Sequence, residues 1–371
     1  MDAEAQSPRV ASRSVNRANR ARTATVVGVG LIGGSVALVL RRSGWHVIGV
    51  DNDETRAQEA LAAEVVDEMG ELGTCDLAVI ATPVNSIAEL ARAALDAGAA
   101  VVTDVGSVKA PIAEAVTDGR FVAGHPIAGS EQDGVFGASA DMFSGAAWVL
   151  CPTTATDDAA FSQVKEIVTA AGAQPMVVSP ERHDRLVAVV SHVPHLTAAT
   201  LMRVAVGRTD RQNGLLRFAA GGFRDMTRIA AGQPTIWPAI CAQNSSAIVG
   251  VLDDLISELA SLREIVAEGD ELQLLAHLEG ARVARRNLPT TAPAPEALSE
   301  MRVPVLDRPG ELAAIAMLAT ELDVNIYDLE IAHSPEGPRG VVVLLVESET
   351  AERLQSALSE QGYRPSIQPL G

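Results

Sequence analysis

The amino-acid sequence predicts an α/β protein with a doubly wound parallel sheet, followed by an all-helical domain and a small βαββαβ unit. Three observations predict this class. Short β-branched runs alternate with helical stretches from Thr25 to about Val178, which is typical of buried parallel strands joined by crossover helices. Apolar residues then recur at helical spacing as far as about Asn287. After Met301 the expected elements follow the order βαββαβ, which builds a four-stranded sheet with helices on one face.

The first domain is expected over residues 23–179. Its strand-like runs are TATVVGVG, HVIGVD, DLAVIAT, AAVVTDVG, RFVAGH and AWVLCP. Each run is short and apolar, as a strand buried on both faces requires. The stretches between them are rich in Ala and Leu and are expected to be helices, for example Ile32–Arg42, Glu54–Ala63 and Ile87–Ala97.

The second domain is expected over residues 180–287 and has few strand candidates. Apolar residues at helical spacing predict three long helical segments, Asp184–Val206, Thr235–Leu262 and Gly269–Arg286. The apolar run that begins at Trp237 favours a homodimer core, although burial within one chain explains it nearly as well. Asn244 in that run is either a pocket residue or a polar interruption of an interface.

The third domain is expected over residues 301–371. A linker, LPTTAPAPEALSE at residues 288–300, precedes it and is rich in Pro, Thr and Ala. The expected strands are Met301–Leu306, Asn325–His333, Gly340–Glu347 and Tyr363–Gln368, and the expected helices are Gly310–Leu322 and Thr350–Gln361. At the other end, residues 1–22 carry five arginines among Ser, Ala and Asn. We expect a disordered tail there, and a transit peptide is the alternative.

Composition excludes several classes of function. The chain has 371 residues, 47 of them acidic and 29 basic, for a net charge of −18. A field of that sign repels nucleic acids and anionic membrane surfaces, so neither is an expected partner. No apolar run reaches the ~20 residues of a spanning helix. Cys75, Cys151 and Cys241 lack metal-binding spacing. We expect a soluble, cytoplasmic protein with no metal site.

A glycine-rich turn predicts a dinucleotide site. The spacing G-x-G-x-x-G falls on Gly28, Gly30 and Gly33, between the first expected strand and the first expected helix. In such a turn one glycine allows the bend, one lets the backbone approach the pyrophosphate, and one lets the helix pack on the strand. The helix N-terminus favours the phosphates. The alternative is a structural turn that binds nothing.

The strand that follows ends in an acid suited to a ribose. Asp51 ends HVIGVD, 18 residues beyond Gly33. Its carboxylate can accept hydrogen bonds from ribose hydroxyls and would repel a 2′-phosphate, which favours NAD over NADP. Arg56, one helical turn further on, is the argument against that preference. The remaining expected cofactor contacts are Leu31, Ile32 and Thr82.

Polar residues follow two neighbouring strands of the expected sheet. Ser107 and Lys109 follow the fourth run, and His125 and Glu131 lie in GHPIAGSE at the end of the fifth. Open α/β sheets bind ligands at the carboxyl ends of their strands, so these side chains are expected near a nicotinamide ring. His125 is the natural acceptor for the proton of a hydroxyl whose carbon loses hydride. The alternative is a loop histidine that packs on Pro126.

The helical block supplies further candidates. His192 and His195 lie in SHVPH, Arg224 and Arg228 lie in GGFRDMTRIA, and Trp237 follows. The two arginines are four residues apart and would share one face of a helix. Guanidinium groups suit bidentate capture of carboxylates. The alternative is a solvated charge pair.

Together these motifs carry a resemblance to a known family. GVGLIGGS, DVGSVK, GHPIAGSE, SHVPH and GGFRDMTRIA, in this order, are similar to the prephenate/arogenate dehydrogenases of tyrosine biosynthesis over about Thr25 to Asn287. The resemblance implies a Rossmann domain, a helical dimerisation domain, and NAD-dependent oxidative decarboxylation of prephenate to 4-hydroxyphenylpyruvate. It also implies a catalytic role for His125 with Ser107, and substrate-binding roles for a set of pocket residues, namely Arg228, Arg224, His192, His195, Glu131 and Trp237.

The last domain resembles a regulatory ACT domain. LDRPGELAAIA lies at the first strand-to-helix turn and NIYDLEIA on the second strand. Gly310 and Asn325 fall on positions typical of the amino-acid site of such domains. The resemblance therefore implies an aromatic amino acid, such as tyrosine, as a feedback effector.

Other readings stay open at this point. Arogenate is the alternative substrate, and Glu131 or Asp133 could pair with its ammonium group. A β-hydroxyacid dehydrogenase would need a lysine in the helical domain, whereas the two lysines of the chain, Lys109 and Lys165, lie in the first domain. A regulator that binds nucleotide without turnover would leave His125 and the arginines without a role.

Overall fold

The computed structural model describes residues 22–129, 134–207, 221–287, 297–306, 308–333 and 339–369. The chain divides into two compact units, Met1–Ile256 and Ser257–Gly371. This division falls within one helix and differs from the three domains expected from the sequence, whose limits stay a prediction. Nearly all of the expected tail and most of the expected linker lie outside the described residues.

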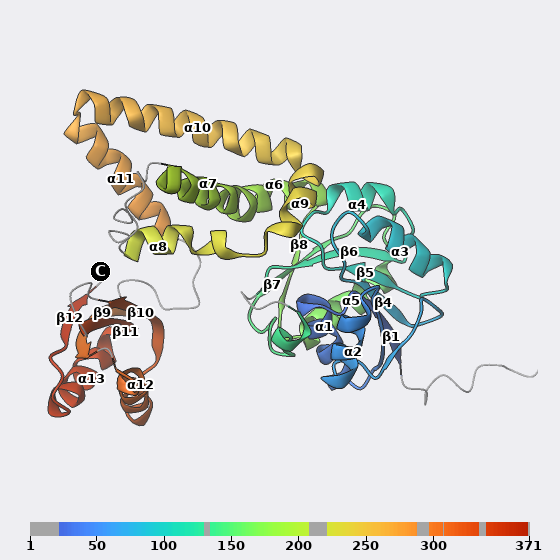
Figure 1. The fold of residues 1–371 in the computed structure, drawn as a ribbon, viewed down its shortest axis with the longest axis horizontal. Helices are drawn as coiled ribbons and strands as arrows, with labels where there is room; N and C mark the ends of the chain where they lie inside the picture. Colours follow the sequence, from blue (N-terminus) through green and yellow to red (C-terminus); the bar gives the residue numbers. More distant parts are fainter. Residues whose placement is uncertain are drawn as a thin grey trace, which may run out of the picture. The chain divides into compact units, whose positions relative to one another are not determined.

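The first unit is built on an eight-stranded sheet with the order β3-β2-β1-β4-β5-β6-β7-β8 (Figure 1). Neighbouring strands are parallel from β3 across to β6. The six expected strands are present, and two short strands that the sequence analysis did not predict, β3 and β8, lie at the edges. The strands are β1 Thr23–Val27, β2 His46–Val50, β3 Glu68–Met69, β4 Leu77–Ile80, β5 Val102–Asp104, β6 Phe121–Pro126, β7 Ala147–Cys151 and β8 Gln174–Val177.

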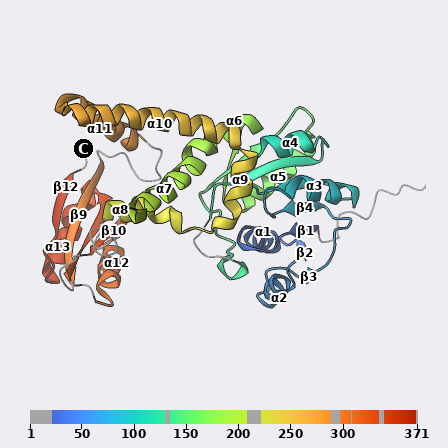
Figure 2. The same ribbon diagram turned by 45° about the horizontal axis from the view of Figure 1, so that its top comes forward.

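Helices cover both faces of this sheet, as Figure 2 shows for α1 and α2 on one side and α3 and α4 on the other. One apolar cluster joins α1, α2 and α5 to the sheet, and a second joins α3 and α4 to the opposite face. The described strands β4 and β1 are almost wholly buried, which explains their continuous apolar sequences. The helices are α1 Leu31–Arg42, α2 Glu54–Ala62, α3 Ile87–Asp96, α4 Ala110–Ala115 and α5 Asp158–Ala170.

The expectation of a wholly parallel sheet needs one correction. β7 pairs with β6 in the antiparallel sense, and β8 runs parallel to β7. A parallel partner needs a crossover connection that takes the chain back to the amino ends of the strands, usually through a helix. The chain between β6 and β7 instead stays at the carboxyl end of β6 and enters β7 there, where the N–H of Ile127 donates to the carbonyl of Ala147. The described part of this connection contains the short 3-10 helix η1, Val135–Gly137.

The helical part of the chain is more broken than the sequence predicts. The expected segment Asp184–Val206 becomes α6 Pro180–Val187, a π turn η2 Ala188–His192, and α7 Val193–Gly207. Ser179 caps α6 by accepting the N–H of Arg182. The remaining helices are α8 Gly221–Thr227, η4 Arg228–Ala231, η5 Pro234–Ile236, α9 Trp237–Gln243, α10 Ser245–Glu268 and α11 Glu271–Arg286.

The C-terminal unit contains the expected βαββαβ arrangement. Its antiparallel sheet has the order β10-β11-β9-β12, and Figure 1 shows α12 and α13 on one side of it. The first strand begins at Leu298, so the last three residues of the expected linker belong to the sheet. The elements are β9 Leu298–Leu306, α12 Glu311–Glu321, β10 Ile326–His333, β11 Arg339–Glu347, α13 Ser348–Glu360 and β12 Ser366–Pro369.

The described residues contain neither a membrane-spanning helix nor a cluster of metal ligands. None of the helices there has both the length and the apolar character needed to cross a membrane. No group of three or more His, Cys, Asp or Glu side chains in that part of the chain could hold a metal ion.

A buried ion pair joins the carboxyl ends of β5 and β6. The ammonium group of Lys109 donates to Asp104 and, at 2.9 Å, to the carbonyl of Gly124. Both charged side chains are fully buried. Asp104 also accepts the N–H groups of Gly106 and Gly124 at 2.9 and 3.1 Å. This pair therefore fixes the two strand ends that carry Ser107 and His125.

We expect Lys109→Met to lower the free energy of unfolding by ~3–5 kcal/mol, because it leaves the charge of Asp104 buried without a counter-charge. Adding Asp104→Asn should recover part of that loss, since the neutral amide no longer needs a counter-charge. Guanidinium unfolding followed by tryptophan fluorescence measures both effects. A double variant that is less stable than Lys109→Met alone would contradict this account.

Candidate active site

The glycine-rich turn has the geometry that each glycine was expected to provide. Gly28 has a φ of +91°, and a Cβ there would lie 2.5 Å from the carbonyl oxygen of Ala81. A Cβ on Gly33 would lie 1.8 Å from the carbonyl oxygen of Gly28, so only glycine lets α1 pack this close to β1. A Cβ on Gly30 would meet no atom within 4 Å. The open space at Gly30, at the start of α1, fits a pyrophosphate held by the helix N-terminus.

A cavity of about 590 Å³ opens beside this turn. It brings together four of the expected cofactor contacts, Gly30, Leu31, Ile32 and Gly33, with Thr82 after β4. Ser107 also lines it, as do His195 and Trp237 from the helical part of the same unit. The further lining residues, which the sequence analysis did not identify, are Ala81, Pro83, Val84, Val105, Gly106, Ile229, Ala231–Pro234, Ile236 and Ile240.

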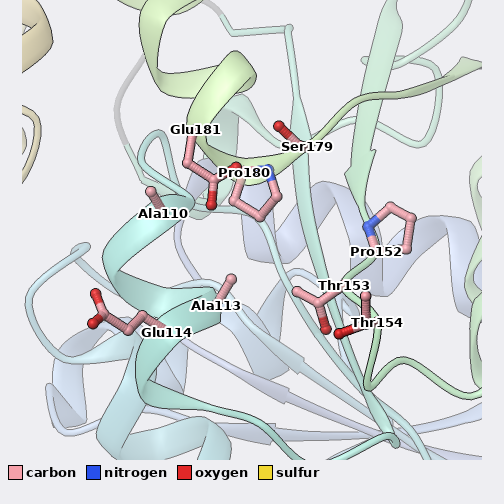
Figure 3. A pocket seen from close by; sticks show the side chains of 9 residues that line it. All are labelled: Ala110, Ala113, Glu114, Pro152, Thr153, Thr154, Ser179, Pro180 and Glu181. Carbon is pink, nitrogen blue, oxygen red and sulfur yellow. The ribbon is translucent and has the colours of Figure 1, made fainter.

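A second cavity, of about 720 Å³, is shown in Figure 3. Residues of α4, the segment after β7 and the start of α6 line it. None of the expected site residues is among them, and its charged side chains, Glu114 and Glu181, are both acidic and exposed. That charge opposes the anionic substrate expected from the sequence, so the cavity beside the glycine turn is the candidate active site.

His125 lies near the end of β6 and is tied to two further residues. Its Nδ1 lies 2.9 Å from Nε2 of His183, whose Nδ1 lies 2.7 Å from Oδ1 of Asp184. Asp184 also accepts the N–H groups of Lys109 and Ala110, at 2.7 and 2.8 Å. These contacts satisfy both oxygens of the Asp184 carboxylate at the start of α4.

These contacts set the direction of the hydrogen bonds. The carboxylate of Asp184 can only accept, so Nδ1 of His183 carries the proton and donates it. In the neutral ring, Nε2 of His183 then accepts the N–H of His125 Nδ1. Nε2 of His125 is left with its lone pair. The arrangement therefore leaves Nε2 of His125 as a proton acceptor, although His125 is not among the residues that line the cavity.

The surroundings also keep His125 neutral. Burial lowers the pKa of His125 well below its ordinary value, and repulsion from Lys109, and from His183 and His192 whenever those rings are protonated, lowers it further. A neutral imidazole is the form that can take a proton from a hydroxyl.

His192 is buried behind the cavity wall and is not among the residues that line the cavity. Burial lowers the pKa of this ring to about 4. Its Nδ1 accepts the amide N–H of Asn244 at 3.2 Å, and the same amide donates to the carbonyl of Asp184 at 2.8 Å. The ring contacts Trp237 edge-on, with centroids 6.1 Å apart. Thus Asn244 is a buried link between helices, and His192 supports the wall of the cavity.

His195 and Trp237 form a flat part of that wall. Their rings are stacked, with centroids 3.7 Å apart and planes inclined by 14°. Burial lowers the pKa of His195, which keeps this ring neutral against the indole. A planar apolar surface of this kind suits a ring-shaped ligand.

The two arginines are arranged differently from the expectation. α8 ends at Thr227 and Arg228 begins the 3-10 helix η4, so Arg224 and Arg228 do not share a face of one α-helix. Both are exposed, and neither is among the residues that line the cavity, although Ile229 is. Glu131, like Asp133, lies outside the described residues.

Asp51 occupies the expected strand end but is closed in by its own backbone. Its side chain is 3% exposed and accepts the N–H groups of Val29 and Asp53 at 3.0 and 2.9 Å. It does not line the cavity. Asp51 thereby connects the end of β2 to the glycine-rich turn.

The two expected regulatory residues of the C-terminal unit lie apart. Gly310, with a φ of +97°, precedes α12, and Asn325 follows that helix. The helix has eleven residues, which separates its ends by ~16 Å. One copy of the chain therefore does not place Gly310 and Asn325 in a common site.

His183 and Asp184 are the functional candidates that the sequence analysis missed. The pair is adjacent in PERHDRLV, directly after the expected start of the helical domain. A histidine and an acid next to each other in a helix that also carries Glu181, Arg182 and Arg185 are a weak indication of a buried network. Their meaning depends on Lys109 and His125, which are far away in sequence.

Two alanine variants of the glycine-rich turn should separate folding from cofactor binding. Gly33→Ala forces α1 away from β1 and should lower the free energy of unfolding by ~1–3 kcal/mol. Gly30→Ala has space for its methyl group, so it should fold normally but bind NADH at least ~10-fold more weakly, because the methyl occupies the place of the pyrophosphate. Thermal unfolding and NADH fluorescence titration measure the two effects. Equal stability of the two variants would contradict the packing argument.

Comparison with known proteins agrees with this site. The family model "Prephenate dehydrogenase, nucleotide-binding domain" matches residues 36–177, and "Prephenate dehydrogenase, dimerization domain" matches residues 179–280. Prephenate dehydrogenase of Bacillus subtilis (strain 168) is 33% identical over 344 residues, 88% of this chain and 92% of that protein. Cyclohexadienyl dehydrogenase of Zymomonas mobilis is 30% identical over 71% of this chain and 95% of that protein.

A solved structure gives the same result. Prephenate dehydrogenase from A. aeolicus, in complex with hydroxyphenyl propionate and NAD+, is similar with a TM-score of 0.69 and 29% sequence identity. The similarity covers 74% of this chain and 100% of that chain. With both family domains present in order around the cavity described above, this chain belongs to the prephenate dehydrogenase family of NAD-dependent oxidoreductases.

Proposed function

We propose that this protein catalyses the NAD-dependent oxidative decarboxylation of prephenate to 4-hydroxyphenylpyruvate, in tyrosine biosynthesis. The observation that carries the proposal is the hydrogen-bonded series Asp184, His183, His125, which presents a neutral imidazole at the carboxyl edge of the sheet. This series belongs to a chain that is similar to prephenate dehydrogenases over most of the length of those proteins.

The chain offers a fitting place for the cofactor. Gly30 leaves room for the pyrophosphate at the start of α1, and Leu31, Ile32 and Thr82 line the same cavity. Bound NAD accepts the hydride that leaves the hydroxyl-bearing carbon of the substrate. Asp51 holds the turn in shape from the end of β2.

His125 acts as the general base of the reaction. Its Nε2 takes the hydroxyl proton as the carbon–oxygen bond becomes a carbonyl. The ring carboxylate then leaves as carbon dioxide, its bonding electrons complete the aromatic ring, and the oxygen regains a proton to give the phenol. Because aromatisation makes this step favourable, the protein mainly has to orient the reactants.

Other residues position the substrate in this proposal. Ser107 lines the cavity and would hold the hydroxyl that reacts, and the stacked His195 and Trp237 would face the ring. Arg224 and Arg228, from α8 and η4, would bind the carboxylates. Their exposed guanidinium groups are weakly hydrated and can form paired hydrogen bonds with carboxylates. The substrate-binding role of Glu131, which lies outside the described residues, stays a proposal from the resemblance.

A homodimer is proposed for the working enzyme. The matched family model for residues 179–280 is a dimerization domain. The long helices α10 and α11 support the proposal because each exposes large apolar side chains. Among these are Val249, Ile256, Leu259, Val266, Leu272, Leu275, Leu278 and Val283.

Arogenate is the second candidate substrate. It carries an ammonium group where prephenate has a keto group, and one relative of this chain is a cyclohexadienyl dehydrogenase. The candidate acids for that ammonium group, Glu131 and Asp133, lie outside the described residues. The ratio of kcat/KM for the two substrates, measured through NADH absorbance, decides between them.

The C-terminal unit is proposed to bind an aromatic amino acid as an effector. A small cavity of about 90 Å³ lies at the end of β9, next to Gly310, with Arg308 and Glu311 on its rim and apolar walls. These two side chains are paired at 2.6 Å, and Glu311 also accepts the hydroxyl of Tyr363. A cation and an anion beside an apolar surface suit the charged groups of a free amino acid. Asn325 would join such a site from a second copy.

Replacing His125 tests the mechanism. We expect His125→Asn to lower kcat with prephenate by ~10²–10⁴-fold and to leave the Kd for NADH within a factor of ~3, because only an acid/base group is lost. The exposed His277→Asn serves as the control and should behave as the wild type. Because the pKa of His125 is lowered, kcat/KM of the wild type should stay high as pH falls through 6.5 and decline only below that value. Unchanged turnover in His125→Asn would remove the residue from the mechanism.

Effector binding is tested on the full chain. We expect tyrosine to release or absorb heat in isothermal titration and Arg308→Ala to weaken its binding at least ~10-fold, because the carboxylate loses its charged partner. Arg364→Ala, an exposed arginine outside the small cavity, is the matched control. A titration without heat for each of the three aromatic amino acids would contradict the regulatory role.

A further inference from the structure

The end of β2 carries an ion cluster beside the glycine-rich turn. Asp51 is held by the N–H of Val29, the residue between Gly28 and Gly30. Asp53 and Arg56 follow at the beginning of α2. A dinucleotide with its pyrophosphate at Gly30 places its adenosine ribose at this strand end. NAD and NADP differ only by the 2′-phosphate on that ribose, so the cluster lies where the two are distinguished.

Asp51 by itself is poorly placed to accept hydrogen bonds from the ribose hydroxyls. Each of its oxygens accepts a backbone N–H group, one from Val29 and one from Asp53, and the side chain is 3% exposed. Asp51 contributes a fixed negative charge and a structural connection. The exposed part of the cluster consists of Asp53 and Arg56, whose side chains are 43% and 48% exposed.

Asp53 is surrounded by donors that would also suit a phosphate. Its Oδ1 accepts the N–H groups of Thr55 and Arg56 at 3.0 and 3.2 Å, and its Oδ2 lies 3.4 Å from Nη2 of Arg56. The other guanidinium nitrogen, Nη1, lies 3.9 Å from Oδ1 of Asp51. Backbone N–H groups together with a guanidinium are the donors that phosphates use in proteins.

We propose that Asp53 makes the enzyme selective for NAD by occupying the donors that a 2′-phosphate would need, and that Arg56 is a latent phosphate-binding residue. The inference rests on the proposed NAD-dependent function. Asp51 and Asp53 together place two negative charges against the single positive charge of Arg56, so a phosphate of about −2 charge is repelled. Without Asp53, Arg56 and the two N–H groups become available to it.

Three variants separate charge, space and the arginine itself. Asp53→Ser removes the carboxylate and its bulk, and the small serine hydroxyl can cap α2 through one N–H group while the other N–H group and Arg56 become available to a phosphate. Asp53→Asn removes the charge and keeps both the cap and the bulk. Asp53→Ser combined with Arg56→Gln removes the proposed phosphate partner as well. Glu54→Gln neutralises an exposed acid in the same helical turn and is the matched charge control.

Binding of NADPH and NADH to each full-length variant is measured by fluorescence titration at low ionic strength, without substrate. We expect Asp53→Ser to raise the affinity for NADPH ~10–100-fold, as a gain of charge-assisted hydrogen bonds would, and Asp53→Asn to raise it only ~2–5-fold. The affinity for NADH should stay within ~3-fold in both. Glu54→Gln should change the affinity for NADPH less than ~2-fold, and added salt should reduce the gain in Asp53→Ser.

The double variant is decisive. Loss of the NADPH gain in Asp53→Ser/Arg56→Gln supports the proposal. An unchanged NADPH affinity in Asp53→Ser would overturn the proposal, and so would a gain of the same size in Glu54→Gln or in the double variant. In each of these cases, NADH binding by the wild type would leave the proposed function intact. A wild type that does not bind NADH would overturn the proposed function and this inference together.

Discussion

The carboxylate of Asp184 is the contact on which the rest of the site depends. It accepts the N–H groups of Lys109 and Ala110 at the start of α4 and the ring N–H of His183, while the carbonyl of the same residue accepts the amide of Asn244. A buried carboxylate is costly unless its oxygens are satisfied, and the three N–H donors satisfy both oxygens of this one. They join α6 to the sheet edge and to α9 and α10. The direction of His183, and through it that of His125, follows from this one side chain.

Local patterns allowed much of the first domain to be predicted. The strands β1 and β4 are short, mostly apolar runs because both of their faces are covered, and such runs are visible without any tertiary information. The spacing of Gly28, Gly30 and Gly33 follows from steric limits within one turn. His125 could be placed because parallel strands end at a common edge.

Other features depend on distant contacts and were missed or wrong for that reason. The antiparallel direction of β7 depends on the path of the chain after β6, and the composition of β7 is the same for either direction. The link from Asp184 to Lys109 spans 75 residues, so His183 and Asp184 looked like ordinary helical residues. The substrate-binding role of His192 stays a prediction, and the hydrogen bond from Asn244 places its ring behind Trp237. The sequence suggests Arg228 as a carboxylate-binding residue, but the direction of its side chain depends on the end of α8 at Thr227, which the sequence does not reveal.

The π turn Ala188–His192 determines which face of α7 lies on the cavity wall. A π turn holds one residue more than the α-helical turn that it replaces. If the same residues formed a regular α-helix instead, each side chain after the turn would move by ~100° about the helix axis, and His195 would turn away from Trp237. The stacking of His195 on Trp237 therefore depends on the backbone conformation of the turn that precedes α7.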